Sequence, residues 1–367
     1  MRRGAALCGF WLLLSAFAEP ETLAYDLAAA SSDEQLTAPS TQPPEPGEQY
    51  PPRMADQQTT NAVEQERTAP RRGPEWRLTV DASAVADSNV TNSTDLETVE
   101  LDLGGLILPV PLDPSLREHS DVGFGLSAAL SGRVPVAERV AVAVDAEGYV
   151  LEYDGSVTDD ASFLLALGAE LAGEGGDTFV VQLTGFERRF GGISAMRGLG
   201  VRGRYQLPAG EGNRVSLSID ARFFDSGYGE DFGGTEAGAY LSYEATLAPD
   251  LSGSIGVYAR GSWLGADAYS NRELGAYGGL NRYLGDYFTG GVSGGFSRVV
   301  FRGPILILGP EARRDWRWYG SAYLTTRRPL LVGLTPSLTY TYNRTGSSIE
   351  FYRADRHRLR FGLSRTF

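Results

Sequence analysis

From residue 76 to the end of the chain, apolar and polar side chains alternate with a period of two residues. The stretch WRLTVDASA, which starts at Trp76, puts Trp, Leu, Val and Ala on one face and Arg, Thr, Asp and Ser on the other. Alternation of this kind predicts β-strands with one apolar and one polar face. The stretches are about ten residues long, the length of a tilted strand that crosses a lipid bilayer. The pattern therefore predicts an all-β fold whose sheet has lipid on one face and water on the other.

Fourteen such segments occur between residue 76 and the C-terminus. An even number of antiparallel strands is typical of bacterial transmembrane barrels, with both chain ends on one side. We therefore expect a transmembrane antiparallel β-barrel over residues 75–367, closed by pairing of the first strand with the last so that no edge is left in lipid. The expected strands start near Trp76, Val122, Arg139, Phe163, Thr178, Gly198, Val215, Ala237, Leu251, Glu273, Thr289, Trp316, Leu334 and Arg356.

The lengths of the connecting segments support this interpretation. Connectors after even-numbered strands are short, such as APD (248–250) and LGD (284–286). Those after odd-numbered strands are mostly longer, and the first covers residues 91–120. Outer-membrane barrels have short turns on the periplasmic side and long loops on the outer side, so both termini are expected in the periplasm. A soluble β-sandwich would give no reason for this alternation.

The N-terminal region predicts export. Residues 1–18 fit a cleaved signal peptide, with Arg2 and Arg3 before an apolar run and Ala16-Phe17-Ala18 at the cleavage site. Residues 19–74 are rich in Pro, Gln, Thr and Glu and predict a disordered periplasmic linker. A short docking segment for a partner is the alternative. No later run reaches the ~18 apolar residues of a transmembrane helix, so localisation in the outer membrane of a Gram-negative cell is expected.

Composition excludes several classes of function. The net charge of −13 disfavours nucleic-acid binding. The single cysteine, Cys8, would leave with the signal peptide, so the mature chain has no thiol nucleophile and no cysteine for a zinc site. His119 and His357 are the only histidines, and no serine in a nucleophile elbow accompanies His357. We expect no enzyme, no cofactor and no bound metal.

Charged side chains occupy the polar faces of the predicted strands. Near the membrane midplane, an Arg side chain that faced lipid would cost ~2–4 kcal/mol, so these residues are expected to face the lumen. They form either a charged pore that guides cargo or a lumen held together by Arg–carboxylate pairs. The candidate pore-lining residues are Arg202, Arg204, Arg214, Asp220, Arg222, Glu244, Arg260, Arg317, Arg358 and Arg360.

The last residues, RHRLRFGLSRTF, alternate in the same way and end on phenylalanine. Phe361, Leu363 and Phe367 on one face resemble the signal that the barrel-insertion machinery recognises. Phe367 is expected at the boundary between the membrane and the periplasm.

The first long connector contains GLILPVPL (105–112), which is apolar for a loop. An exposed apolar patch would be a surface for a partner protein, and the alternative is a plug or lid over the lumen. Asn89 and Asn92 match glycosylation sequons, which we interpret as polar loop chemistry.

Three segments resemble the surface lipoprotein assembly modifier family. GLTPSLTYTYNRTGSSIEFYRADRHRLRFGLSRTF (333–367) is similar to the last hairpin of these proteins, with Ser348 where they have Asn. WRLTVDASAVADSNVT (76–91) resembles their first barrel strand, with Asp87, Ser88, Asn89 and Val90 in its D-S-N-V/I element. RRDWRWYGSAYLTTRRPLLVGLTP (313–336) is similar to the region before the last hairpin.

The resemblance implies an outer-membrane barrel that passes lipoproteins or secreted proteins to the cell surface. Members usually carry a tetratricopeptide-type helical domain before the barrel, and residues 19–74 are too short and too Pro-rich for one. A separate periplasmic partner would then act with the barrel, besides outer-membrane lipid, the insertion machinery and the cargo. The alternative function is a passive porin or small-solute channel.

Overall fold

The computed structural model describes residues 73–102, 104–154, 158–330 and 333–367. The predicted signal peptide and nearly all of the predicted linker lie outside these residues. The helical elements that lie wholly within them are three single turns: η2 (Pro114–Leu116), η4 (Glu230–Phe232) and η5 (Glu350–Tyr352). No helix in this part of the chain is long and apolar enough to cross a membrane.

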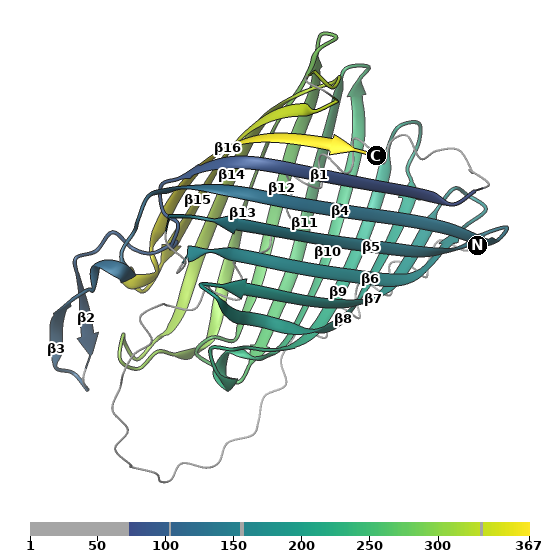
Figure 1. Cartoon of the computed structure of the whole chain (residues 1–367). Coiled ribbons are helices and arrows are strands. Elements are labelled where there is room, and N and C mark those ends of the chain that lie inside the picture. Colours follow the sequence, from purple (N-terminus) through teal and green to yellow (C-terminus); the bar gives the residue numbers. More distant parts are fainter. Residues whose placement is uncertain (1–72, 103, 155–157, 331–332) are drawn as a thin grey trace. The chain divides into compact units, whose positions relative to one another are not determined.

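Fourteen strands close into one antiparallel barrel, as the alternation predicts (Figure 1). Twelve of them begin within three residues of the expected start, whereas β14 and β8 begin four and five residues earlier. The strands are β1 (Glu75–Asp87), β4 (Asp121–Ala137), β5 (Val140–Glu152), β6 (Asp160–Ala172), β7 (Thr178–Phe190), β8 (Ile193–Pro208), β9 (Arg214–Asp225), β10 (Gly234–Ala248), β11 (Leu251–Leu264), β12 (Asn271–Leu284), β13 (Phe288–Pro304), β14 (Ala312–Thr326), β15 (Thr335–Ser347) and β16 (Ala354–Thr366).

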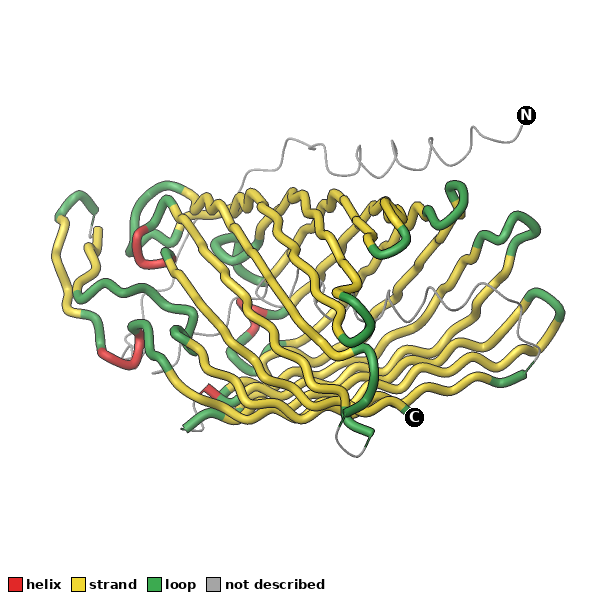
Figure 2. Tube along the Cα trace, turned by 90° about the horizontal axis from the view of Figure 1, so that it is seen from above, coloured by secondary structure: helices red, strands yellow, loops and turns green. Residues whose placement is uncertain are grey.

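The two ends of the barrel differ. β1 begins and β16 finishes at the turn end, where β10 and β11 are joined by residues 249–250. The opposite, loop end has the 88–120 connector and most of the longer ones (Figure 2). The exception at the loop end is the β7–β8 connector, which consists of Gly191 and Gly192 alone. Their φ values of 56° and 79° fit a two-residue hairpin turn that needs positive φ at both positions.

A seam between β1 and β16 closes the barrel. Their ladder runs from Thr79↔Thr366 to Asp87↔Arg358, and Leu78 and Phe367 exchange two backbone hydrogen bonds beyond it. β1 pairs with β4 over its whole length, from Glu75 to Asp87. Glu75, Trp76 and Arg77 therefore extend past the end of β16 at the turn end.

Alternate side chains of each strand lie on the outer and inner faces. Phe223 of β9 is 63% exposed on the outer face, whereas its neighbour Phe224 is 1% exposed on the inner face. Leu199 on β8 and Leu183 on β7 are also among the most exposed side chains. This large exposed apolar surface is what a lipid-facing wall requires.

Tyrosine rings on the inner face lie flat over glycines of the neighbouring strand. Tyr258 is directly opposite Gly275, and Tyr277 is directly opposite Gly256. A Cβ atom added at Gly275 would lie 2.4 Å from the Tyr258 ring, and one at Gly256 would lie 2.3 Å from the Tyr277 ring. Tyr319 covers Gly295 in the same manner. Gly256, Gly275 and Gly295 therefore give these aromatic rings room against the wall.

The first long connector contains a two-stranded hairpin, β2 (Thr98–Asp102) and β3 (Ile107–Pro111). All five β3 residues are exposed, and the hairpin lies beyond the loop end (Figure 1). A backbone hydrogen bond of 3.0 Å from Asp102 N to Ile307 O joins it to the β13–β14 connector. Exposure of the whole strand does not fit the plug hypothesis for GLILPVPL.

Candidate functional site: the inner ionic network and the seam

An ion-pair cluster holds the loop end of the seam on the inner side. The Asp87 carboxylate, whose side chain is fully buried, accepts hydrogen bonds from Arg356 Nη2 at 2.8 Å and Arg358 Nε at 2.8 Å. The Tyr153 hydroxyl donates a third bond to it at 2.9 Å. Burial raises the pKa of this phenol, so Tyr153 remains a donor at neutral pH. Further along the seam, Arg360 pairs with Asp81.

The D-S-N-V element of the family continues from this cluster and fixes the start of the long loop. The Ser88 hydroxyl accepts a hydrogen bond from His357 N at 2.9 Å. The Asn89 side chain is fully buried and donates to Ser93 O at 2.8 Å and to Asp355 O at 3.0 Å. These contacts join β1 to β16 at the loop end, so the motif has a structural role. A buried, hydrogen-bonded Asn89 amide also fits polar loop chemistry and not a glycosylation site.

A second ionic cluster lies on the inner face of β9 to β14. Glu273 on β12 is directly opposite Arg260 on β11, and its carboxylate is 2.5 Å from Arg260 Nη2. The Tyr258 hydroxyl donates to Glu273 at 2.8 Å, and Arg317 lies 3.8 Å away. Arg260 and Glu273 are 6% and 4% exposed, so other side chains cover this part of the inner wall. Buried charges of this kind need both partners.

Arg313 at the loop end of β14 joins the strands to the loops. Its guanidinium lies between the rings of Phe301 and Tyr352, 4.0 Å and 3.8 Å from their centroids. It also donates to Asp315 at 2.8 Å. Tyr352 belongs to η5, so this cation–π sandwich attaches the last loop to the barrel wall.

The remaining sequence-predicted site residues lie on the same inner face as these clusters. Arg202 lies 3.5 Å from Asp145 and also bonds to Gln182. Arg214 and Glu244 form a 2.8 Å ion pair, and Asp220 and Arg222 are 3.8 Å apart. Arg204 is directly opposite Val180 and Ser218. These ion pairs are the arrangement expected if Arg–carboxylate pairs hold the lumen together.

The predicted assembly-signal residues lie on the outer face of β16 and at the turn end. Phe361 and Phe367 are 49% and 63% exposed. Leu363 is directly opposite Ala82 across the seam. Recognition of these residues by the barrel-insertion machinery remains a prediction.

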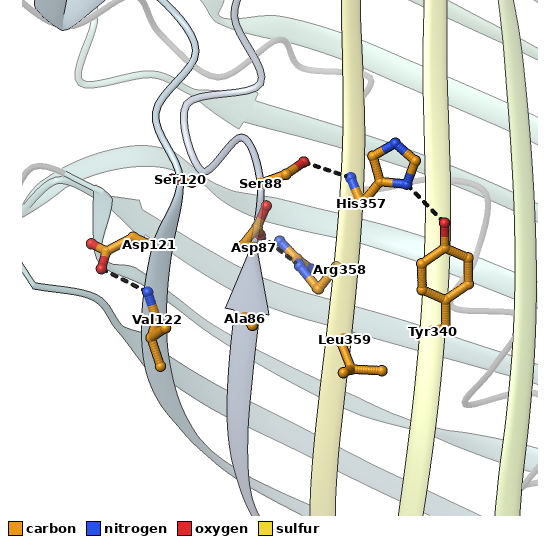
Figure 3. Close-up of a pocket in the computed structure, with 10 residues that line it drawn as sticks. All are labelled: Ala86, Asp87, Ser88, Ser120, Asp121, Val122, Tyr340, His357, Arg358 and Leu359. Carbon is orange, nitrogen blue, oxygen red and sulfur yellow. Dashed lines mark hydrogen bonds and ion pairs between the residues drawn. The ribbon is translucent and has the colours of Figure 1, made fainter.

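A pocket of about 540 Å³ lies at the loop end of the seam (Figure 3). Its lining includes Ser88, Tyr340 and His357. The Tyr340 hydroxyl is 2.7 Å from His357 Nδ1, whereas Ser88 bonds to the His357 backbone. The pocket thus lacks the serine–histidine bond that activates a nucleophile. Among the described residues, no cluster of three metal-ligating side chains is present.

Sequence reasoning missed two features of the site. The inner tyrosines were not identified as wall residues, although their positions on the polar faces of the alternating strands could have indicated it. Arg313 was not singled out, because its packing between Phe301 and Tyr352 depends on where the last loop folds.

Comparison with known proteins identifies the family. The model of the surface lipoprotein assembly modifier family matches residues 76–367. No curated protein matches the chain. The match begins at β1 and ends with the final residue, so it spans the whole barrel.

Solved structures of outer-membrane channels have a distantly similar fold. The outer membrane channel DcaP of Acinetobacter baumannii has a TM-score of 0.44 and 9% identity, over 81% of this chain and 98% of that one. An outer membrane channel from Pseudomonas putida F1 has a TM-score of 0.41 and 12% identity, over 82% and 97%. Likeness of this degree says nothing about what the chain transports. The family match and the closed barrel show that the chain belongs to the surface lipoprotein assembly modifier family and is an outer-membrane β-barrel.

Proposed function

We propose that the barrel is a translocator that delivers lipoproteins or secreted proteins to the cell surface. Membership of the family supports this function. The loop end faces the cell exterior, and the turn end, with Trp76 and Phe367, faces the periplasm. The longer connectors at the loop end support this orientation.

The exposed hairpin β2–β3 is the observation that carries the proposal. Val99, Leu101, Leu108 and Val110 are cross-strand partners on one face of the hairpin. Leu106 at its tip is 60% exposed, and Leu306 in the neighbouring connector is 73% exposed. Apolar patches of this kind mark sites where another molecule binds. A passive channel has no need of such a surface, whereas a translocator must contact its cargo.

Strand addition at the β3 edge is not the means of this contact. Leu112 N donates to Glu97 O at 2.8 Å. Along an antiparallel ladder, the N–H and C=O groups of successive residues point alternately toward the partner strand and away from it. Val110 and Leu108 therefore direct their amides toward β2, and Pro109 and Pro111 lie on the free edge. Proline has no N–H, so this edge lacks most of the donors that an added strand needs. The hairpin binds through its apolar side chains.

The passive porin is the alternative, and partly exposed inner charges such as Arg202 and Asp145 would suit it. The test compares surface proteins of a strain that lacks the chain with those of the same strain complemented by the full chain. Surface proteins are labelled on intact cells and quantified by mass spectrometry. A translocator restores one or a few lipoproteins or secreted proteins to the surface. If no surface protein changes and the purified barrel gives stable ion conductance in planar bilayers, the porin function replaces the proposal.

A further inference from the structure

Arginines on the outer face of β12, β13 and β14 gather at the loop end. Arg272 on β12 and Arg314 on β14 are each directly opposite Val300 on β13. Directly opposite residues of an antiparallel pair have Cβ atoms about 5 Å apart. Arg298 and Arg302 lie two residues before and after Val300 on the same strand. Four exposed guanidinium groups therefore surround one exposed valine.

On all three strands, the outer face changes from arginine to apolar side chains next to this group. On the side of the turn end, the outer residues next to these arginines are apolar: Leu274 on β12, Phe296 on β13 and Trp316 on β14. They are 64%, 44% and 46% exposed. Aromatic residues of barrels concentrate at the boundary between hydrocarbon and headgroups. The arginines therefore lie at the depth of the lipid headgroups.

The charges of Arg298 and Arg314 are not neutralised by a carboxylate of the described residues. Arg302 lies 3.6 Å from Asp267. The Arg298 guanidinium lies over the Trp316 ring, 5.4 Å from its centroid. Neither Arg298 nor Arg314 forms an ion pair within the described ranges. Holding exposed like charges together is unfavourable unless an anion joins them.

The other side of the barrel provides a contrast. Arg197 on β8 is also an exposed outer residue at the loop end, but it is directly opposite Glu187 on β7 and Asp225 on β9. Its neighbour Arg189 pairs with Glu187 at 2.9 Å. Carboxylates thus occupy the flanking positions that arginines occupy around Val300. The chain as a whole has a net charge of −13, so the cationic group is a local exception.

We infer that Arg272, Arg298, Arg302 and Arg314 form a binding site for a phosphate-bearing lipid headgroup. The guanidinium groups bind the phosphates with paired hydrogen bonds, and the acyl chains lie against Leu274, Phe296 and Trp316. With the loop end outside, the lipid is the diphosphorylated glycolipid of the outer leaflet, lipid A. A free phosphate ion would gain nothing from the apolar residues beside the arginines.

Titration of the purified full chain in detergent with diphosphoryl lipid A tests the inference, with binding followed by native mass spectrometry. The double variant Arg298→Gln/Arg314→Gln is expected to bind at least about tenfold more weakly. The matched variant Arg189→Gln/Arg197→Gln removes two outer arginines at the same end and is expected to stay within about twofold. Unchanged affinity in the first variant, or equal loss in both, overturns the site.

The wild-type chain provides a readout that does not depend on the folding of a variant. It should bind diphosphoryl lipid A at least about tenfold more tightly than dephosphorylated lipid A, and inorganic phosphate should not displace the lipid. No preference for the phosphorylated form would overturn the inference, and displacement by inorganic phosphate would assign the site to the free ion. Lipid A as the ligand rests on the proposed orientation. The assay contains no cargo, so it can fail while the export experiment succeeds, and the reverse.

Discussion

At the scale of single residues, the inner wall depends on pairs of one tyrosine and one glycine. Each ring occupies the space that a side chain on the opposite strand would fill, as Tyr258 does over Gly275. The ring covers backbone that glycine leaves bare, and its hydroxyl remains available for the ionic cluster, where Tyr258 bonds to Glu273. Glycine in this wall is therefore a packing residue.

Replacement of Gly275 by valine is expected to destabilise the barrel by about 1–3 kcal/mol, because its Cβ would overlap the Tyr258 ring. The urea midpoint, read from the mobility shift between folded and unfolded protein in gels, measures this. Gly320→Val is the matched control, since nothing lies within 4 Å of a Cβ at Gly320. Equal midpoints for the two variants would contradict the packing role of the pair.

The sequence predicted the inner or outer face of single residues, but not their partners. Period two is enough to place Arg260 and Glu273 on polar faces. It does not show that they lie directly opposite each other, because the register depends on both strands. The arginines that were predicted to face the lumen lie on the inner face. The outward arginines around Val300 were not among them, because the cost argument applies only near the membrane midplane and makes no prediction for the strand ends.

At the scale of elements, the seam is the joint that closes the barrel. Its ladder stops at Thr79 on the turn side, and its loop end is held by Asp87 with Arg356 and Arg358. The two arginines share one buried carboxylate, so the loop end of the joint depends strongly on a single acidic side chain.

The Asp87→Asn variant is expected to lose about 1–3 kcal/mol of stability, because two partly buried guanidinium groups lose their counter-charge. Asp250→Asn removes an ion pair with Arg282 in which both partners are well exposed, and its effect should stay within about 0.5 kcal/mol. Denaturant unfolding of the folded barrel in lipid vesicles compares the two. A small effect at Asp87 would show that backbone pairing alone closes the seam.

The hairpin β2–β3 is expected to be dispensable for folding. Glu97 and Leu112 are hydrogen-bonded at its base, so Asn-Gly can replace residues 98–111. The shortened chain should keep the unfolding midpoint of the full chain within about 0.5 kcal/mol and should lose cargo display in the complemented strain. Retained display would remove the hairpin from the export function and leave the barrel unaffected.

Elements were predicted well wherever they are long and amphipathic. β2 and β3 were missed because they are short, and because the prolines at 109 and 111 argue against a strand unless the edge is free. The two-residue turn between β7 and β8 was missed as an exception to the loop pattern, although Gly191-Gly192 between apolar residues is a known hairpin signal.

At the scale of the whole molecule, the orientation of the barrel is open to direct test. A peptide tag inserted between Gly104 and Gly105, at the exposed tip of the hairpin, should bind antibody on intact cells. The same tag after Gly285, in the β12–β13 turn, should bind only after the outer membrane is permeabilised. The reversed result would place the loop end in the periplasm and assign the arginine group to the inner leaflet.

The architecture could be predicted from sequence because it depends on a single repeated pattern. Fourteen similar segments and an alternation of connector length leave few solutions other than a closed barrel. Cargo could not be predicted in this way, because the surface that we propose for its recognition is a hairpin of only two short strands.

The prolines of the hairpin also affect how neighbouring copies of the barrel can pair. A projecting apolar strand with a complete free edge would be a template on which neighbouring molecules could stack into a continuous sheet. Pro109 and Pro111 interrupt that edge at successive outward positions. We therefore expect that neighbouring copies do not pair through β3, so that the apolar face of each hairpin stays uncovered.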